Sequence, residues 1–125
     1  MPNTIKRGDI YLVNLNLPAK KDGERAEQRS EQRGYRPTLV ISNDFGNDSS
    51  PTVIVAAMTS NRDKPELPTH VKVNTDCGLR HESIILLEQL KTLDKQKLSR
   101  YIGTLDENVM KEIDAALAVS LGINA

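Results

Sequence analysis

The residues most suited to chemistry lie in a polar segment that ends where an apolar run begins. Ser30–Pro37 (SEQRGYRP) carries carboxylate, amide and guanidinium groups, and Arg36 stands directly before Pro37. Proline fixes its own φ and disfavours helical backbone at the preceding residue, so Arg36 is expected on a stiff, extended backbone. A guanidinium held in this way is a forked donor suited to phosphate. A plain salt bridge from Arg36 to Glu31 or another loop carboxylate is the structural alternative.

A second polar group follows an apolar run later in the chain. Met58-Thr59-Ser60-Asn61 ends a run of β-branched and small apolar residues with three consecutive hydrogen-bonding side chains. If this strand end lies beside Arg36, a planar cation and hydroxyl groups converge on one point, which suits a bound phosphate. An ordinary polar strand end is the alternative.

Three further polar residues stand out against apolar surroundings. His70 is expected on the polar face of an alternating strand, where a solvated surface histidine is the commoner case. Glu88 and Gln89 interrupt a strongly apolar run, and a buried polar pair needs partners. They are therefore expected either to line a wet groove or to reach a loop backbone. The sequence has no Gly-rich phosphate loop, no acidic or histidine metal cluster and no recognisable Ser–His–Asp spacing.

Length and composition limit the class of protein. The chain has 125 residues, with 17 basic and 17 acidic side chains, which fits one domain over residues 1–125 and argues against disorder. The longest apolar runs, Val53–Met58 and Ile84–Leu87, are far short of the ~20 residues of a membrane span. No signal-peptide pattern opens the chain, and Cys77 is the only cysteine, so a cytoplasmic protein without disulfides is expected.

The elements that must position these residues form an α+β fold. The expected strands are Asp9–Leu15, Pro37–Asn43, Thr52–Ser60, Thr69–Asn74, Ser83–Leu93 and Tyr101–Gly103. Between them, Asp44–Pro51 is expected as a turn, Asp94–Leu98 as one helical turn capped by Asp94, and Asn16–Tyr35 as a charged, mobile arm. Thr104–Glu107 has the form of a capping box before an apolar stripe ending near Leu121, with Gly122 as the stop. These short antiparallel strands predict a small, strongly curved sheet or a partly open barrel.

Several segments together resemble the MazF/PemK family of bacterial toxin endoribonucleases. They are Lys6–Tyr11 (KRGDIY), Ser30–Asp44 with its Gly34-Tyr35-Arg36-Pro37 core, Val55–Thr59, Leu67–Val71 (LPTHV) and Leu86–Lys95 (LLEQLKTLDK). The similarity runs from about Ile5 to Leu121 in one register. Relative to the family, residues 20–30 look like a loop insertion.

The resemblance implies a homodimer of SH3-like antiparallel barrels, each with a C-terminal helix, that cleaves single-stranded RNA at a short sequence. It implies no metal or other cofactor, and a MazE/PemI-type antitoxin that blocks the groove. The family's catalytic arginine and threonine fall on Arg36 and Thr59. Its RNA-contacting positions fall on Ser30, Glu31, Gln32, His70, Glu88 and Gln89, and Ser60 beside Thr59 is expected to contact RNA as well.

Two questions stay open at the level of sequence. Metal-free cleavage by the 2′-hydroxyl needs a proton acceptor, for which His70, Glu31 and Glu88 are candidates in that order. The rival function is that of a non-enzymatic toxin of the same fold that binds a protein target such as DNA gyrase. Relatives of that kind lack the arginine–threonine pair, so Arg36 and Thr59 favour the nuclease.

Overall fold

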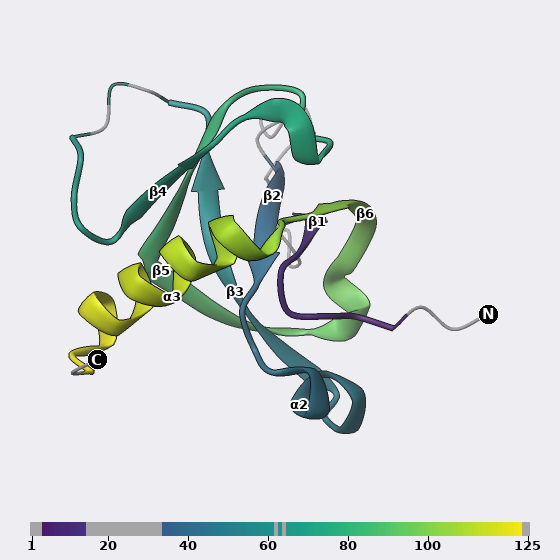
Figure 1. Ribbon diagram of the computed structural model, residues 1–125. Helices are drawn as coiled ribbons and strands as arrows, with labels where there is room; N and C mark the ends of the chain where they lie inside the picture. The colour runs from purple at the N-terminus through teal and green to yellow at the C-terminus, as the bar shows by residue number, and fades with distance from the viewer. Residues whose placement is uncertain (1–3, 15–33, 62, 64, 124–125) are drawn as a thin grey trace, which may run out of the picture.

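The computed structural model describes residues 4–14, 34–61, 63 and 65–123 (Figure 1). Its strands are β1 (Asp9–Asn14), β2 (Tyr35–Val40), β3 (Thr52–Thr59), β4 (His70–Val73), β5 (Ser83–Asp94) and β6 (Leu98–Thr104). Its helices are α2 (Asp44–Ser49) and α3 (Glu107–Leu121), with short 3₁₀ turns η2 (Thr75–Cys77) and η3 (Lys95–Lys97). Of the charged arm expected over Asn16–Tyr35, residues 16–33 lie outside the described residues, and Tyr35 is the first residue of β2 instead of part of the arm. No described helix is long and apolar enough to cross a bilayer.

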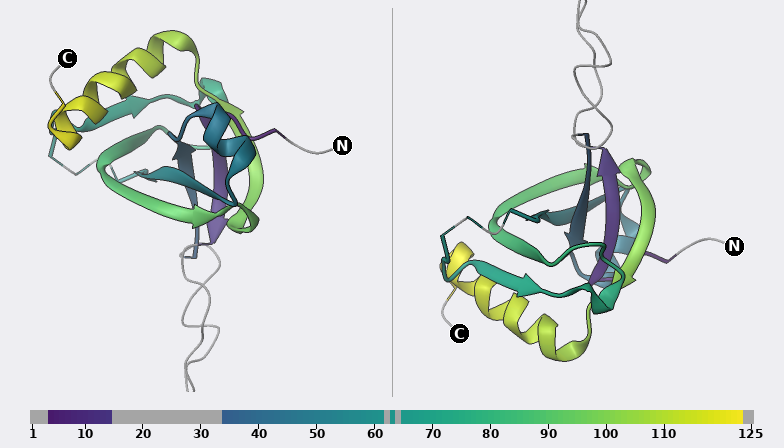
Figure 2. Two further views of the ribbon diagram at one scale, coloured as in Figure 1. Left: turned by 90° about the horizontal axis from the view of Figure 1, so that it is seen from below. Right: turned by 90° about the horizontal axis from the view of Figure 1, so that it is seen from above.

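The strands form one six-stranded sheet in the order β4-β5-β3-β2-β1-β6, and every neighbouring pair is antiparallel. The sheet curves strongly around its own axis, and α3 lies across one face of it, over β4 and β5 (Figure 2). The expected curved antiparallel sheet with a C-terminal helix is therefore confirmed. In the described chain β4 and β6 are the two sheet edges and are not hydrogen-bonded neighbours, so the ladder does not close into a full barrel.

Close backbone packing takes the place of hydrogen bonds where the two edges approach. The turn η2, which follows β4, lies against β6. A Cβ added at Gly103 of β6 would overlap the carbonyl oxygen of Cys77 and lie 2.8 Å from its carbonyl carbon. Gly78, with φ +108°, could not carry a Cβ either, because that atom would lie 2.5 Å from the carbonyl oxygen of Ile102. Two glycines therefore allow the edges to meet backbone to backbone.

The sheet buries apolar side chains on both faces. The larger cluster lies between the sheet and α3, and its members include Ile10, Leu39, Met58, Ile85, Leu87 and Ile113. The smaller cluster lies on the opposite face and contains Tyr11, Val13, Val40, Val53 and Val55. The strand β1 contributes to both clusters, as expected of a strand buried on two sides. The smaller cluster fills only part of its face, which also carries the buried Ile84 and Leu86 and polar side chains such as Thr59 and His70.

Four local expectations differ from the structure. Residues of the expected turn 44–51 form the short helix α2, because the Asn43 side chain accepts a hydrogen bond from the Gly46 amide and caps it. The capping residue of α3 is Asp106 rather than Thr104, since the Asp106 carboxylate accepts from the Val109 amide while Thr104 donates to Asp9. The last strand is longer than Tyr101–Gly103, and Leu121 is 57% exposed instead of buried. Asp94 caps η3 and Gly122 ends α3, as expected.

Candidate active site

Arg36 and Thr59 lie at the ends of two adjacent strands. The register between β2 and β3 pairs Val40 with Val55, Leu39 with Ala56 and Thr38 with Ala57. Continued by two residues, this register would place Arg36 opposite Thr59, on the same sheet face as Thr38 and Ala57. The pairing stops at Pro37, which has no amide proton to donate. Arg36 is exposed and Thr59 is half-buried, so the guanidinium and the hydroxyl share an accessible corner of the sheet.

The backbone after β3 turns sharply at this corner. The Thr59 hydroxyl accepts a hydrogen bond of 3.1 Å from the Asn61 amide, which ties the end of the strand to the start of the next loop. This bond uses an acceptor lone pair of Thr59 and leaves its hydroxyl proton available as a donor. Ser60, beside it, is exposed.

His70 lies on the same face of the sheet as Arg36 and Thr59. It pairs with Leu86 of β5, and Leu86 pairs with Ala57 of β3, which pairs with Thr38 of β2. Directly paired residues share a face, and this face is opposite the one that α3 covers. The fold therefore brings the three side chains onto one surface.

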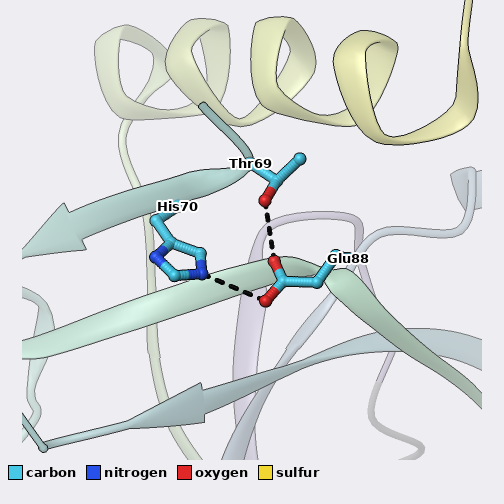
Figure 3. Close-up of polar contacts among 3 residues, drawn as sticks. All are labelled: Thr69, His70 and Glu88. Atoms are coloured by element: carbon cyan, nitrogen blue, oxygen red, sulfur yellow. Dashed lines mark hydrogen bonds and ion pairs between the residues drawn. The ribbon is translucent and has the colours of Figure 1, made fainter. Parts of the chain in front are cut away.

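His70 is not the solvated surface histidine that its strand pattern suggests, since its side chain is only 5% exposed. Its Nε2 lies 3.0 Å from Oε2 of Glu88, and the Thr69 hydroxyl donates a 2.8 Å hydrogen bond to the other carboxylate oxygen, Oε1 (Figure 3). Within the described residues the His70 Nδ1 is buried and has no hydrogen-bond partner. Three residues thus form a compact polar cluster, which we call the Glu88 clamp (Thr69, His70 and Glu88).

The clamp holds Glu88 in its ionised form. Partial burial opposes ionisation of this carboxyl, but the hydrogen bonds from His70 and Thr69 outweigh it and hold the pKa of Glu88 below its usual range. An ionised carboxylate only accepts hydrogen bonds, and it has about four acceptor positions. Two of them face the clamp, and the Glu88 side chain is still 33% exposed. Glu88 therefore presents a fixed acceptor to the solvent.

A bend in β5 brings Glu88 and Gln89 to the surface. Ala57 of β3 pairs with Leu86, whereas its neighbour Ala56 pairs with Leu90, so residues 87–89 lie outside the ladder as a bulge. Leu87 is buried in the larger cluster, and Glu88 and Gln89 are both exposed. Glu88 does not reach a loop backbone, since its contacts are with the side chains of Thr69 and His70, and the groove lined by Glu88 and Gln89 stays a prediction.

A cavity of about 490 Å³ opens at the end of the β4–β5 pair. Ile84, which lines it, is the cross-strand partner of Thr59, so the cavity adjoins the Thr59 corner. Lys72 also lines it and forms a 2.7 Å ion pair with Glu66, both of them largely exposed. That hydrogen bond and charge hold the pKa of Glu66 below its usual range.

Several residues that the sequence singles out are not covered by the contacts described above. Ser30, Glu31 and Gln32 lie in residues 15–33, which the structure does not describe. Among the described side chains, no three His, Cys, Asp or Glu residues stand together as a possible metal site. The sequence does not predict Thr69 as part of the cluster, although the Leu67–Val71 segment carries part of the family resemblance. Nothing in the sequence indicates which hydroxyl group donates a hydrogen bond to Glu88.

Comparison with known proteins gives a consistent assignment. A sequence model of the family described as PemK-like, MazF-like toxin of type II toxin-antitoxin system matches residues 6–121. The endoribonuclease EndoA of Bacillus subtilis is 45% identical over 120 residues, which cover 95% of this chain and 96% of EndoA.

Solved structures show the same fold. A mycobacterial endoribonuclease in complex with its cognate antitoxin superposes with a TM-score of 0.77 at 24% identity, covering 97% of this chain and 98% of that one. A MazE–MazF complex from Deinococcus radiodurans gives a TM-score of 0.71 at 18% identity, with coverage of 98% and 100%. Both share the curved sheet and its C-terminal helix with this chain.

Proposed function

Since the chain belongs to the PemK-like, MazF-like family of type II toxins, we propose that it is an endoribonuclease that cleaves single-stranded RNA at a short sequence. The observation that carries the proposal is the common strand-end position of Arg36 and Thr59, on the sheet face that α3 leaves open. The 45% identity to EndoA, over nearly the whole of both chains, supports the same activity. A toxin that acts on messenger RNA in this way works in the bacterial cytoplasm and arrests growth.

The reaction uses the substrate's own 2′-hydroxyl. Its oxygen forms a bond to the adjacent phosphorus while the bond from phosphorus to the 5′-oxygen breaks. The hydroxyl gives its proton to a base and the departing oxygen gains one, so the products are a 2′,3′-cyclic phosphate and a 5′-hydroxyl. No metal ion takes part in this sequence of bond changes.

Arg36 and Thr59 stabilise the transition state. Negative charge builds on the phosphoryl oxygens as phosphorus gains its fifth oxygen, and Arg36 offers forked donors to those oxygens. A preorganised donor of this kind is typically worth ~10²–10³ in rate. Guanidinium groups rarely release a proton, so Arg36 is assigned charge stabilisation rather than proton transfer. The free hydroxyl proton of Thr59 bonds a phosphate oxygen.

Recognition of the flanking bases follows from the surrounding surface. Single-stranded RNA is read through bases that splay out and expose their edges. Glu88 and Gln89 at the β5 bend offer acceptors and donors to such edges, and the cavity beside Ile84 has room for a base next to Thr59. Ser60 and the Ser30–Gln32 segment complete the proposed RNA-contacting set, and the buried His70 belongs to it through its contact with Glu88.

The cleavage reaction is tested with purified protein and a long single-stranded RNA in EDTA, followed by mapping of the new ends. The expected result is cutting at a short recurrent sequence, with cyclic phosphate and 5′-hydroxyl ends. Activity that disappears in EDTA and returns with magnesium overturns the metal-free mechanism. An RNA left intact by a folded protein that binds DNA gyrase favours the non-enzymatic toxin instead.

The two site residues are tested with matched controls. Arg36→Ala should lose at least ~10²-fold in cleavage rate, and Thr59→Ala a similar or smaller factor. If both act on one phosphate, their effects should be strongly non-additive. Arg100→Ala and Thr52→Ala remove the same groups from exposed positions on β6 and at the far end of β3, and should retain activity. Equal losses of cleavage rate in Arg100→Ala and Thr52→Ala would contradict an active site confined to Arg36 and Thr59.

We also propose that the active form is a homodimer whose groove takes both RNA and a MazE/PemI-type antitoxin. Type II toxins are neutralised by a protein partner, and a solved relative is an endoribonuclease with its cognate antitoxin. A groove between two-fold related copies presents the same residues twice. Sedimentation at micromolar concentration should give a dimer, and a fully active monomer would contradict the proposal.

A further inference from the structure

The bulge in β5 needs an external support. Residues 87–89 leave the ladder with β3, so Glu88 and Gln89 lack the strand partner that fixes their neighbours. A bulge re-aims its side chains, and the direction in which they point depends on what anchors the backbone there. Any group that reads RNA from this bend must be held by contacts from elsewhere in the fold.

Thr69 supplies this anchor through both its backbone and its side chain. Its carbonyl oxygen accepts a 2.9 Å hydrogen bond from the Leu87 amide, and its hydroxyl donates 2.8 Å to Oε1 of Glu88. Thr69 itself belongs to a tight turn closed by a 2.9 Å bond from the His70 amide to the Leu67 carbonyl oxygen. Pro68 fixes φ at the second position of that turn, so the anchor is stiff.

His70 contacts the second carboxylate oxygen of Glu88, Oε2. A neutral imidazole with its proton on Nε2 donates to Oε2 of Glu88 and leaves Nδ1 as a bare acceptor. Because Nδ1 is buried, it is out of reach of an RNA hydroxyl. The contacts make His70 a donor to Glu88 and remove it from the candidates for the proton acceptor.

We infer that Thr69 and His70 are positioning residues that fix Glu88 as a specificity-determining acceptor for an N–H group on an RNA base. The inference rests on the proposed ribonuclease function and names the chemistry of one of its contacts. A carboxylate repels phosphate and accepts only from donors, which in RNA are the amino and imino groups of the base edges and the ribose 2′-hydroxyls; only the base groups make the contact dependent on sequence, which the base substitutions below test. Holding the carboxylate in advance lowers the entropy cost of making that contact.

The test uses the single-stranded RNA whose cleavage site has been mapped, together with versions substituted at each base around the cut. Thr69→Val removes the hydroxyl and keeps the shape of the side chain, while Thr69→Ser keeps the hydroxyl. Since hydrogen bonds to a charged group are the strong ones, Thr69→Val should lose about ten- to hundredfold in kcat/KM, mainly through KM, and should discriminate less at one base position. Thr69→Ser should recover most of this loss.

His70 is tested with the same logic. The side-chain amide of His70→Gln can donate near the place of Nε2, whereas His70→Phe cannot donate at all. A higher kcat/KM for His70→Gln than for His70→Phe fits a donor role for His70. An equal loss of kcat/KM in both variants overturns that role in favour of proton transfer. Melting temperatures measured for all variants separate activity from folding.

A double-mutant cycle makes the inference independent of any loss of stability. In a Glu88→Gln background, Thr69→Val should have little further effect on kcat/KM or on base discrimination, because its partner has already changed. Additive losses, or a Thr69→Val enzyme that cleaves and discriminates as the unmodified protein does, overturn the inference. If the unmodified protein cuts no RNA at all, the proposed function has failed instead.

Discussion

Replacing Gly103 with alanine should force apart the seam between η2 and β6. The new methyl group would overlap the Cys77 carbonyl group, and both partners are backbone, so no rotamer change can relieve the clash. Cys77 and Ile102 at this seam pack against the larger cluster, so separating the two segments also loosens that packing. Overpacking of a core typically costs 1–3 kcal/mol, and a backbone clash belongs at or above the top of that range.

We therefore expect Gly103→Ala to lower the free energy of unfolding by about 3 kcal/mol, or about 10–15 °C in Tm for a chain of this size. Gly46→Ala is the matched control, because its added methyl group meets only the Asn43 side chain, at 3.4 Å and beyond. An alanine inside a helix is favoured over glycine by roughly 0.5–1 kcal/mol, so this variant should be as stable as the unmodified protein or slightly more so.

The assay is thermal and urea unfolding followed by circular dichroism, with every variant at one protein concentration because association shifts apparent stability. A Gly103→Ala protein within about 1 kcal/mol of the unmodified protein would refute the argument. In that case the two sheet edges would not be held together by close backbone packing.

Three further predictions concern the core, a helix cap and acid stability. Ile113→Ala removes a fully buried side chain between α3 and the sheet and should cost ~2–5 kcal/mol in urea unfolding, and a smaller loss would mean that α3 packs loosely. Asp106→Ala removes the cap that accepts from the Val109 amide and should cost about 1 kcal/mol, measured in the same way; no loss would exclude this cap. Because hydrogen bonds lower the pKa of Glu88 in the folded state, its contribution to stability is present above its ordinary pKa of about 4.3 and is lost as pH falls through the lowered value. Glu88→Gln should therefore weaken the dependence of Tm on pH in that acidic range, and an unchanged dependence contradicts the clamp.

The fold could be predicted well because its signals are local. Runs of β-branched residues such as Thr52–Thr59 indicate strands wherever they occur, and the apolar spacing around Ile113 indicates a helix. The short helix α2 was missed because Gly46, Asn47 and Asp48 individually favour turns. Its stability comes from the Asn43 cap and from buried Asn47, whose side chain bonds Ser42, and these contacts form only in the folded chain.

The site could be predicted only in part, for a different reason. Arg36 stood out because it closes a polar segment directly before an apolar run, and Thr59 because it opens a polar group directly after one. The contact between Thr69 and Glu88 spans 19 positions and depends on a bulge that the continuous apolar run Ile84–Leu87 conceals. The burial of His70 was missed for the same reason, because strand alternation predicts which face a side chain is on and not what covers it.

The bend in β5 also bears on how such a protein can diversify. Of the three bulge residues 87–89, only Leu87 packs into the larger cluster. The backbone of Glu88 and Gln89 is not paired with β3. Changes at Gln89 therefore leave the register of every neighbouring strand untouched. A library randomised at Gln89, with Glu88 kept as the partner of the buried His70 ring, should consist mostly of folded members, so that new target preferences can be selected without first repairing the scaffold.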